Sequence, residues 1–191
     1  MIAIEEVEIG RFEESFEILK ILSQVETFNW NLQDKYGDTA ALTASEFLSE
    51  PGYLKYLQLL LQNQKENIDW NVQSSHDGNT VAMRVASHEY VDCLNMLSQR
   101  LNMNLKDHSG WTAAMHAVMF GGVGCIKVLS KIDGIEWNVL TKCNISALVM
   151  AAYDPEILQV LLTSITSICQ MKMTMIILLS CWRPKEEILK H

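Results

Sequence analysis

Short stretches of small and apolar residues recur along the chain in a fixed order, and polar loops separate them. Four of these stretches begin with a Thr or Ser, and they comprise residues 39–44, 80–85, 112–117 and 146–151. A second apolar stretch follows each of them, at residues 56–60, 93–97, 125–129 and 157–161. Apolar residues three and four positions apart share one face of a helix, so each unit predicts a pair of short helices, the second of them amphipathic.

The start of each unit predicts both a turn and a helix cap. The hydroxyl residues that begin the units are Thr39, Thr80, Thr112 and Ser146, and successive ones lie 41, 32 and 34 residues apart. A Ser or Thr side chain at a helix start accepts a hydrogen bond from an otherwise unpaired backbone N–H. Two residues earlier stand residue types that tolerate left-handed backbone, namely Gly37, Gly78, Gly110 and Asn144. We therefore expect a tight turn before each first helix.

A loop phrase of an aromatic or Met residue followed by Asn also repeats. It reads Trp30-Asn31, Trp70-Asn71, Met103-Asn104 and Trp137-Asn138. We expect its Trp side chains, and nearby Phe28, to be buried between repeats. Self-similarity at this period indicates a solenoid, in which each unit packs only on its neighbours.

The repeats predict three regions of the chain. Residues 1–29 form an N-terminal capping helix or partial repeat, since an extra apolar stretch stands at residues 18–22. Residues 30–162 form four repeats, and residues 163–191 form an apolar tail, as a capping helix or an irregular segment. The first repeat has extra residues around 48–52 and 64–67, where we expect a longer helix or loop.

The repeated unit resembles the ankyrin repeat over about residues 15–162. A family unit reads roughly Asp-x-x-Gly-x-Thr-Pro-Leu-His, then two helices and a loop ending near Asp-Val-Asn. The most similar fragments are Asp69-Trp70-Asn71 and Asp107-His-Ser-Gly110-Trp-Thr112, and the Trp-Asn phrase is similar to divergent animal-type arrays. The family Pro is replaced by Ala40, Val81, Ala113 and Ala147, and the family His by Leu42, Met83, Met115 and Val149. The resemblance implies an all-α solenoid of stacked helix-turn-helix pairs that binds a protein partner and is not an enzyme.

The formal net charge of −8 lies in the first quarter of the chain. Residues 1–50 hold 11 acidic and 3 basic side chains, whereas residues 51–191 hold 12 of each. Because Lys and Arg do not cluster, the composition argues against nucleic acid as a partner. The acidic run within residues 5–17 would suit a basic partner, although such runs are more often the solvated face of a helix.

Cysteine and leader patterns indicate a reducing compartment. The five cysteines include no CxxC pair, and Met1–Gly10 lacks the layout of a signal peptide, so we expect a cytoplasmic protein, with the nucleus as the alternative. Cys93 and Cys125 are equivalent positions of stacked helices, roughly 8–10 Å apart, which exceeds the reach of a disulfide. We expect them to fill the core.

Catalytic and metal-binding patterns are missing from the sequence. It contains no Gly-x-Ser-x-Gly elbow, phosphate-binding loop or His-Glu-x-x-His motif. His76 and His108 occupy equivalent positions, so the repeat spacing keeps them from sharing a metal. The glycine cluster at residues 121–124 is interpreted as the turn between two helices. We predict no catalytic site, cofactor or metal.

The C-terminal tail leaves a second hypothesis open. Residues 160–182 contain one charge, Lys172, and are long enough to span a bilayer. Polar residues interrupt this stretch, and its uninterrupted apolar core, Met175–Leu179, is short. A cap on the last repeat is therefore preferred, with a membrane-tethered adaptor that uses residues 160–182 as its anchor as the alternative. A truncated or misread C-terminus is also open.

The resemblance also implies a binding surface. The family's exposed positions lie four, three and one residues before the hydroxyl and seven and eight after it. Here they are Lys35, Tyr36, Asp38, Glu46, Phe47, His76, Asp77, Asn79, Ser87, His88, His108, Ser109, Trp111, Met119, Phe120, Lys142, Cys143, Ile145, Tyr153 and Asp154. Clustering of Trp111, Met119 and Phe120 predicts an interface with Trp111 as its anchor. The alternative is that Trp111 packs on its own hairpin. We expect a monomer with an unidentified protein partner.

Overall fold

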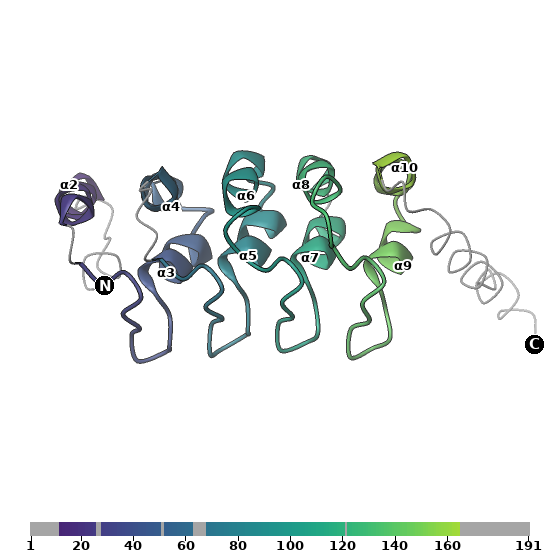
Figure 1. Ribbon diagram of the computed structural model, residues 1–191, viewed down its shortest axis with the longest axis horizontal. Helices are drawn as coiled ribbons and strands as arrows, with labels where there is room; N and C mark the ends of the chain where they lie inside the picture. Colours follow the sequence, from purple (N-terminus) through teal and green to yellow (C-terminus); the bar gives the residue numbers. More distant parts are fainter. Residues whose placement is uncertain (1–11, 26–27, 51, 63–67, 121, 165–191) are drawn as a thin grey trace, which may run out of the picture.

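Paired short helices run along the computed structural model, which describes residues 12–25, 28–50, 52–62, 68–120 and 122–164 (Figure 1). A first helix, α2, spans Phe12–Gln24. Four helix pairs follow it in the described part of the chain: α3 (Ala40–Glu46) with α4 (Tyr53–Gln62), α5 (Val81–Ser87) with α6 (Val91–Leu97), α7 (Ala113–Met119) with α8 (Val123–Leu129), and α9 (Ala147–Ala151) with α10 (Pro155–Ser164). No strand occurs among these residues. The predicted all-α solenoid is confirmed.

The helices form two layers. In one layer α3, α5, α7 and α9 pack on one another in that order, and in the other α2, α4, α6, α8 and α10 do the same. Figure 1 shows both layers, with a hairpin loop projecting from the base of each helix of the first, which we call the inner layer. Each unit therefore contacts mainly its neighbours, and the hairpin loops are presented side by side along one edge.

Small side chains bring the inner helices close together. Alanines at this layer are almost fully buried: Ala40, Ala41, Ala44, Ala82, Ala86, Ala113, Ala114, Ala117, Ala147 and Ala151. The outer helices contribute larger apolar side chains, among them Leu57, Leu60, Leu94, Leu97, Ile126, Leu129 and Leu161. Together these side chains form one continuous core along the stack.

The predicted turns are confirmed, and the predicted caps are confirmed with one exception. All four turn residues have positive φ: Gly37 (78°), Gly78 (78°), Gly110 (85°) and Asn144 (58°). The hydroxyls of three cap residues accept hydrogen bonds from the backbone N–H three positions on, and these are Thr39, Thr80 and Ser146. The exception is Thr112, whose buried Oγ1 has no hydrogen-bond partner among the described residues.

The repeated loop phrase joins each unit to the next. The side chains of Trp30, Trp70 and Trp137 are buried as predicted, and Phe28 is half-buried against the core. The following Asn accepts a hydrogen bond from a backbone N–H of the next loop: Asn31 from Asp69 (2.7 Å), Asn71 from Asn102 (2.7 Å) and Asn104 from Glu136 (3.0 Å). Hydrogen bonds therefore link consecutive loops along the stack.

Two further expectations concern local geometry. The glycine cluster falls only partly in the turn between α7 and α8: Gly122 precedes α8, whereas Gly124 lies inside α8, where a Cβ would be 2.6 Å from Cγ2 of Val91. In the first repeat α4 has ten residues, as α10 has, against seven in α6 and in α8; it lies between the two stretches of extra residues, and residues 48–50 of the first stretch form a turn rather than helix. Residues 63–67 lie outside the described residues.

The prediction that two cysteines fill the core is confirmed. Cys93 and Cys125 are free and buried, as expected. Burial raises the pKa of their thiols, to about 11 and about 12.

Of the tail, the structure describes only the end of α10, and residues 165–182 lie outside the described part. Within that part, no helix has both the length and the apolar character to cross a bilayer.

Candidate functional site

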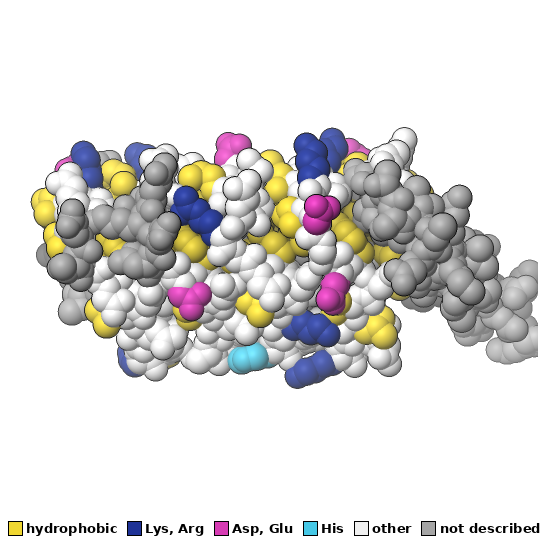
Figure 2. All heavy atoms as spheres, in the orientation of Figure 1, with side chains coloured by type: hydrophobic (Ala, Val, Ile, Leu, Met, Phe, Trp, Pro, Cys, Tyr) yellow, Lys and Arg dark blue, Asp and Glu magenta, His cyan; other side chains and the backbone are white. Residues whose placement is uncertain are grey.

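The tips of neighbouring hairpin loops are joined by hydrogen bonds. The backbone N–H of His108 donates to the carbonyl of Asp77 at 2.9 Å, and that of Lys142 donates to the carbonyl of Ser109 at 3.1 Å. Equivalent tip positions carry exposed side chains that are cationic or imidazole: Lys35, His76, His108 and Lys142. Figure 2 shows side chains of these types along the lower edge of the molecule, where the hairpins end. These hydrogen bonds therefore fix the distance between neighbouring hairpin tips.

The base of three of the four hairpins is less exposed than the sequence predicted. The residue just before each cap closes its hairpin, because its carbonyl accepts a hydrogen bond from the first hairpin residue, as in Asp34 to Asp38 (3.0 Å) and Asp107 to Trp111 (2.9 Å). Asp38 is only 7% exposed, so its predicted place on the surface is wrong. At the same position Asn79 and Trp111 are half-buried, and Ile145 is exposed.

Trp111 packs on its own repeat. Its ring centroid lies 5.5 Å from that of His116 on α7, and its side chain contacts the core. The sequence left open that Trp111 packs on its own hairpin; the side chain packs within its own repeat, but against His116 of α7 and the core. Only part of Trp111 faces solvent.

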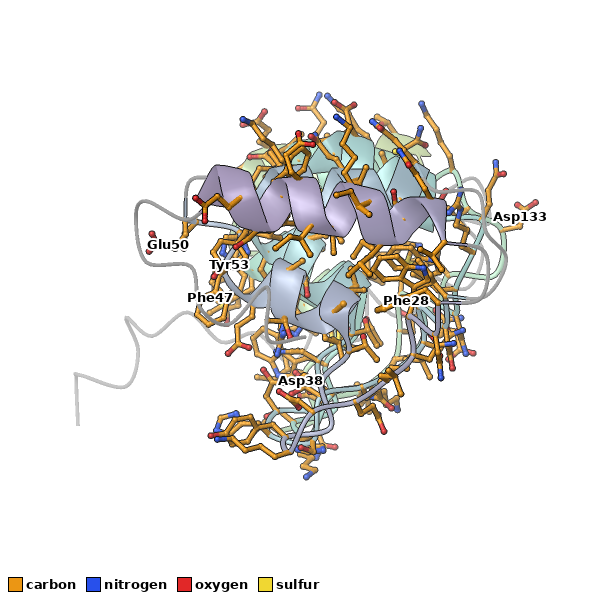
Figure 3. The ribbon with its side chains drawn as sticks, turned by 90° about the vertical axis from the view of Figure 1, so that its left-hand side faces the viewer. Phe28, Asp38, Phe47, Glu50, Tyr53 and Asp133 are labelled. Carbon is orange, nitrogen blue, oxygen red and sulfur yellow. The ribbon has the colours of Figure 1, made fainter. Side chains whose placement is uncertain are left out.

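Large apolar side chains project from the ends of the inner helices. Met119 and Phe120, at the end of α7, are 59% and 61% exposed, and Tyr153, after α9, is 77% exposed. Phe47, after α3, is 42% exposed and lies 5.3 Å from Tyr53 between ring centroids. Figure 3 shows Phe47, Tyr53 and Glu50 together on one side of the stack, opposite Phe28 and Asp133. We call the hairpin tips and these helix ends the inner surface.

Arg84 connects the first two repeats beneath the inner surface. It is 8% exposed, and its Nη1 donates to the carbonyl of Leu42 at 2.9 Å. Its guanidinium lies 3.7 Å from a carboxylate oxygen of Glu46 and 3.6 Å from one of Asp77. Burial opposes ionisation of Asp77, but hydrogen bonds from Asn79 and the Arg84 charge outweigh it, and the pKa of Asp77 is lowered.

His116 connects the second and third repeats in a similar way. Its Nε2 lies 3.2 Å from Oδ2 of Asp107, and its Nδ1 lies 3.1 Å from Oγ of Ser87. Burial lowers the pKa of His116, although the hydrogen bond and charge of Asp107 act in the opposite direction. In the neutral ring Nε2 donates to the Asp107 carboxylate, and Nδ1 is then an acceptor that shares the single proton of the Ser87 hydroxyl with the Met83 carbonyl.

The linked side chains of Ser87, His116 and Asp107 carry the same functional groups as the catalytic triad of a hydrolase. Their surroundings nevertheless favour a structural role. The Ser87 hydroxyl also lies 2.9 Å from the carbonyl of Met83, at the C-terminal end of α5. Carbonyl oxygens and the helix dipole disfavour the negative charge that a nucleophile would develop there. No group of three or more potential metal ligands occurs among the described residues.

Sequence reasoning missed both connecting side chains. Arg84 and His116 stand four residues after a cap hydroxyl, within stretches that were interpreted only as tightly packed helix. Their charge or polarity at equivalent positions is the signal that would have revealed them. The sequence analysis also missed two exposed apolar side chains on the opposite limb of the hairpins, Leu32 and Leu140.

Comparisons with known proteins agree with this architecture. A sequence model of three ankyrin repeats matches residues 49–141. The crystal structure of an ankyrin repeat domain from Acinetobacter baumannii AYE superposes with a TM-score of 0.61 and 22% identity, covering 80% of this chain and 75% of that one. No curated protein matches the sequence. The chain therefore carries ankyrin repeats, matched over residues 49–141 and flanked on both sides by helices of the same stack.

Proposed function

We propose that this chain is a protein-binding module whose inner surface contacts the partner. Ankyrin repeats are in general protein-interaction modules, and the observation that supports the surface is the group of exposed apolar side chains at the inner-helix ends. Met119, Phe120 and Tyr153 are each more than half exposed, on adjacent repeats. Clustered apolar side chains on a protein surface usually mark an interaction site.

The surface is rigid enough to bind without large rearrangement. The helix ends that carry the apolar residues are anchored in the core, and hydrogen bonds between tips hold the hairpins in register. A surface that is ordered before binding loses less conformational entropy in the complex. Of the predicted positions, the proposal omits Asp38, which is buried, and keeps the others: Lys35, Tyr36, Glu46, Phe47, His76, Asp77, Asn79, Ser87, His88, His108, Ser109, Trp111, Met119, Phe120, Lys142, Cys143, Ile145, Tyr153 and Asp154.

A co-purification experiment tests the proposal. The full chain and a Met119→Ser/Phe120→Ser variant are used as bait in a cell extract, and bound proteins are quantified by mass spectrometry. Ile21→Ser is the matched control, because Ile21 on α2 is 61% exposed, as Phe120 is. We expect specific partners to be lost with the double variant and kept with the control. Equal recovery by all three baits would exclude this surface.

A further inference from the structure

The inner surface has two ends of different chemistry. Around the third and fourth repeats it is apolar, with Met119, Phe120 and Tyr153 exposed. Around the first and second repeats it carries the carboxylates of Glu46 and Asp77, at 48% and 35% side-chain exposure, beside Lys35 and His76 at the hairpin tips, and we call this part the acidic end. The two ends lie on consecutive repeats of one stack, so a single extended ligand can contact both.

The negative charge of the acidic end is only partly neutralised within the chain. One guanidinium, that of Arg84, lies between the carboxylates of Glu46 and Asp77 and also donates to the Leu42 carbonyl. Glu50 is exposed beside Phe47, on the side of the stack that Figure 3 shows. In the same repeat Asp38 is buried, and its Oδ1 has no hydrogen-bond partner among the described residues. The single positive charge of Arg84 therefore does not neutralise all the carboxyl groups at this end.

We propose that the inner surface binds an extended segment of a partner protein that places a Lys or Arg on Glu46 and Asp77 and apolar side chains on Met119 and Phe120. This inference rests on the proposed function and specifies the chemistry of the partner. The exposed ring of Phe47 adds a face on which the stem of a Lys or the plane of an Arg packs.

The repeat spacing sets the distance between the two features of the ligand. Stacked helices lie roughly 8–10 Å apart, and the acidic and apolar ends are one to two repeats apart. An extended chain advances about 3.3 Å per residue. The basic residue and the first apolar anchor of the partner are therefore about three to six residues apart.

Peptide selection tests the inference. Random twelve-residue peptides are displayed on phage and selected on the full chain, and the binding of each enriched peptide to Met119→Ser/Phe120→Ser is then measured. We expect enriched peptides to combine a Lys or Arg with an apolar pair at the stated spacing. A synthetic peptide from this set should bind Glu46→Gln up to about five-fold more weakly, as removal of an exposed ion pair implies. The same peptide with Gln in place of its base should bind both forms equally, and Glu156→Gln, at an exposed position of α10, is the control variant.

The outcomes separate the two proposals. Peptides that bind the wild type and Met119→Ser/Phe120→Ser equally well would contradict the proposed binding surface itself. Peptides that depend on Met119 and Phe120 but carry no base, carry acids instead, or bind Glu46→Gln undiminished would leave the surface intact and overturn the basic partner. Failure to enrich any peptide would overturn the basic-apolar segment as the ligand.

Discussion

Nδ1 of His116 lies 3.1 Å from the Ser87 hydroxyl, so a side-chain contact crosses the boundary between the second and third repeats. The boundary before it has an equivalent contact, between Glu46 and Arg84. In both cases the residue seven positions after one cap hydroxyl meets the residue four positions after the next. Polar contacts at this layer therefore couple consecutive repeats, beside the apolar core that they share.

The His116 contact predicts a pH dependence of stability. The folded state lowers the pKa of His116 from its ordinary value of 6.5, so the unfolded chain takes up this proton at higher pH than the folded chain. The stability that comes from the neutral ring is complete above pH 6.5 and is lost as the pH falls through the folded value. We expect a lower urea midpoint at pH 5.5 than at pH 7.5.

A His116→Gln variant isolates this residue. The Gln amide is able to donate to Asp107 and accept from Ser87, but it does not titrate. We expect the difference in unfolding free energy between wild type and variant to shrink or reverse from pH 7.5 to pH 5.5. An identical pH dependence in both proteins would show that His116 does not couple protonation to folding.

The hairpin turns predict a graded cost of substitution. Gly78 and Gly134 both have positive φ, at 78° and 85°, which costs a non-glycine residue roughly 1–2 kcal/mol. A Cβ at Gly78 would also lie 2.6 Å from the backbone nitrogen of His108, whereas a Cβ at Gly134 meets nothing within 4 Å. We expect Gly78→Ala to reduce the unfolding free energy by about 1 kcal/mol more than Gly134→Ala. Equal losses in urea titrations would argue against the tight contact between neighbouring hairpins.

Most of the architecture was predictable from the sequence, because each level of local chemistry points to the same unit. Gly110 before Thr112, followed by a stretch rich in alanine, specifies a turn, a helix start and a close helix contact. The burial of the Asp38 side chain was not predictable in this way. Side-chain burial at the hairpin base depends on how the loop folds back on its own repeat, which a spacing rule does not contain.

The exposure of the side chains predicted for the binding surface was anticipated only in part, for the same reason. Trp111 falls at a position that is exposed in the family pattern, but its ring finds His116 as a neighbour within its own repeat. Met119 and Phe120, at the end of α7, are 59% and 61% exposed, even though the Phe120 ring stacks on that of His116 at 6.4 Å between centroids. The spacing rule therefore did not distinguish the half-buried Trp111 from the exposed Met119 and Phe120, and the role of Trp111 as an anchor for a partner stays a prediction.

Trp111 and Phe120 should respond differently to truncation. Trp111 is half-buried against the core, so we expect Trp111→Ala to reduce the unfolding free energy by roughly 1–2 kcal/mol, less than for a fully buried Trp. Phe120→Ala, at an exposed position, should stay within about 0.5 kcal/mol of the wild type. Urea denaturation followed by circular dichroism measures both. A Trp111→Ala protein as stable as the wild type would contradict the packing of this side chain against α7 and the core.

The linked loops predict a modest contribution from each Asn. Removal of the Asn71 side chain leaves the Asn102 N–H without its 2.7 Å acceptor, at an exposed site where water replaces part of the interaction. We expect Asn71→Ala to lower the unfolding free energy by about 0.5–1.5 kcal/mol. Asn95→Ala, at an exposed position of α6, is the control and should be neutral or slightly stabilising. Equal effects of the two substitutions would show that the loop contact does not stabilise the stack.

Site-specific photo-crosslinking tests most directly whether the inner surface contacts the partner. A benzoylphenylalanine is placed at Phe120, at Tyr153 or, as the control, at Lys127, which is exposed on α8 of the outer layer. After irradiation in cells, crosslinked products are separated by size and identified. We predict that residues 120 and 153 capture the same partner protein and that residue 127 does not. Capture of that partner from residue 127 alone, or equally from all three positions, would contradict the proposed function of the inner surface.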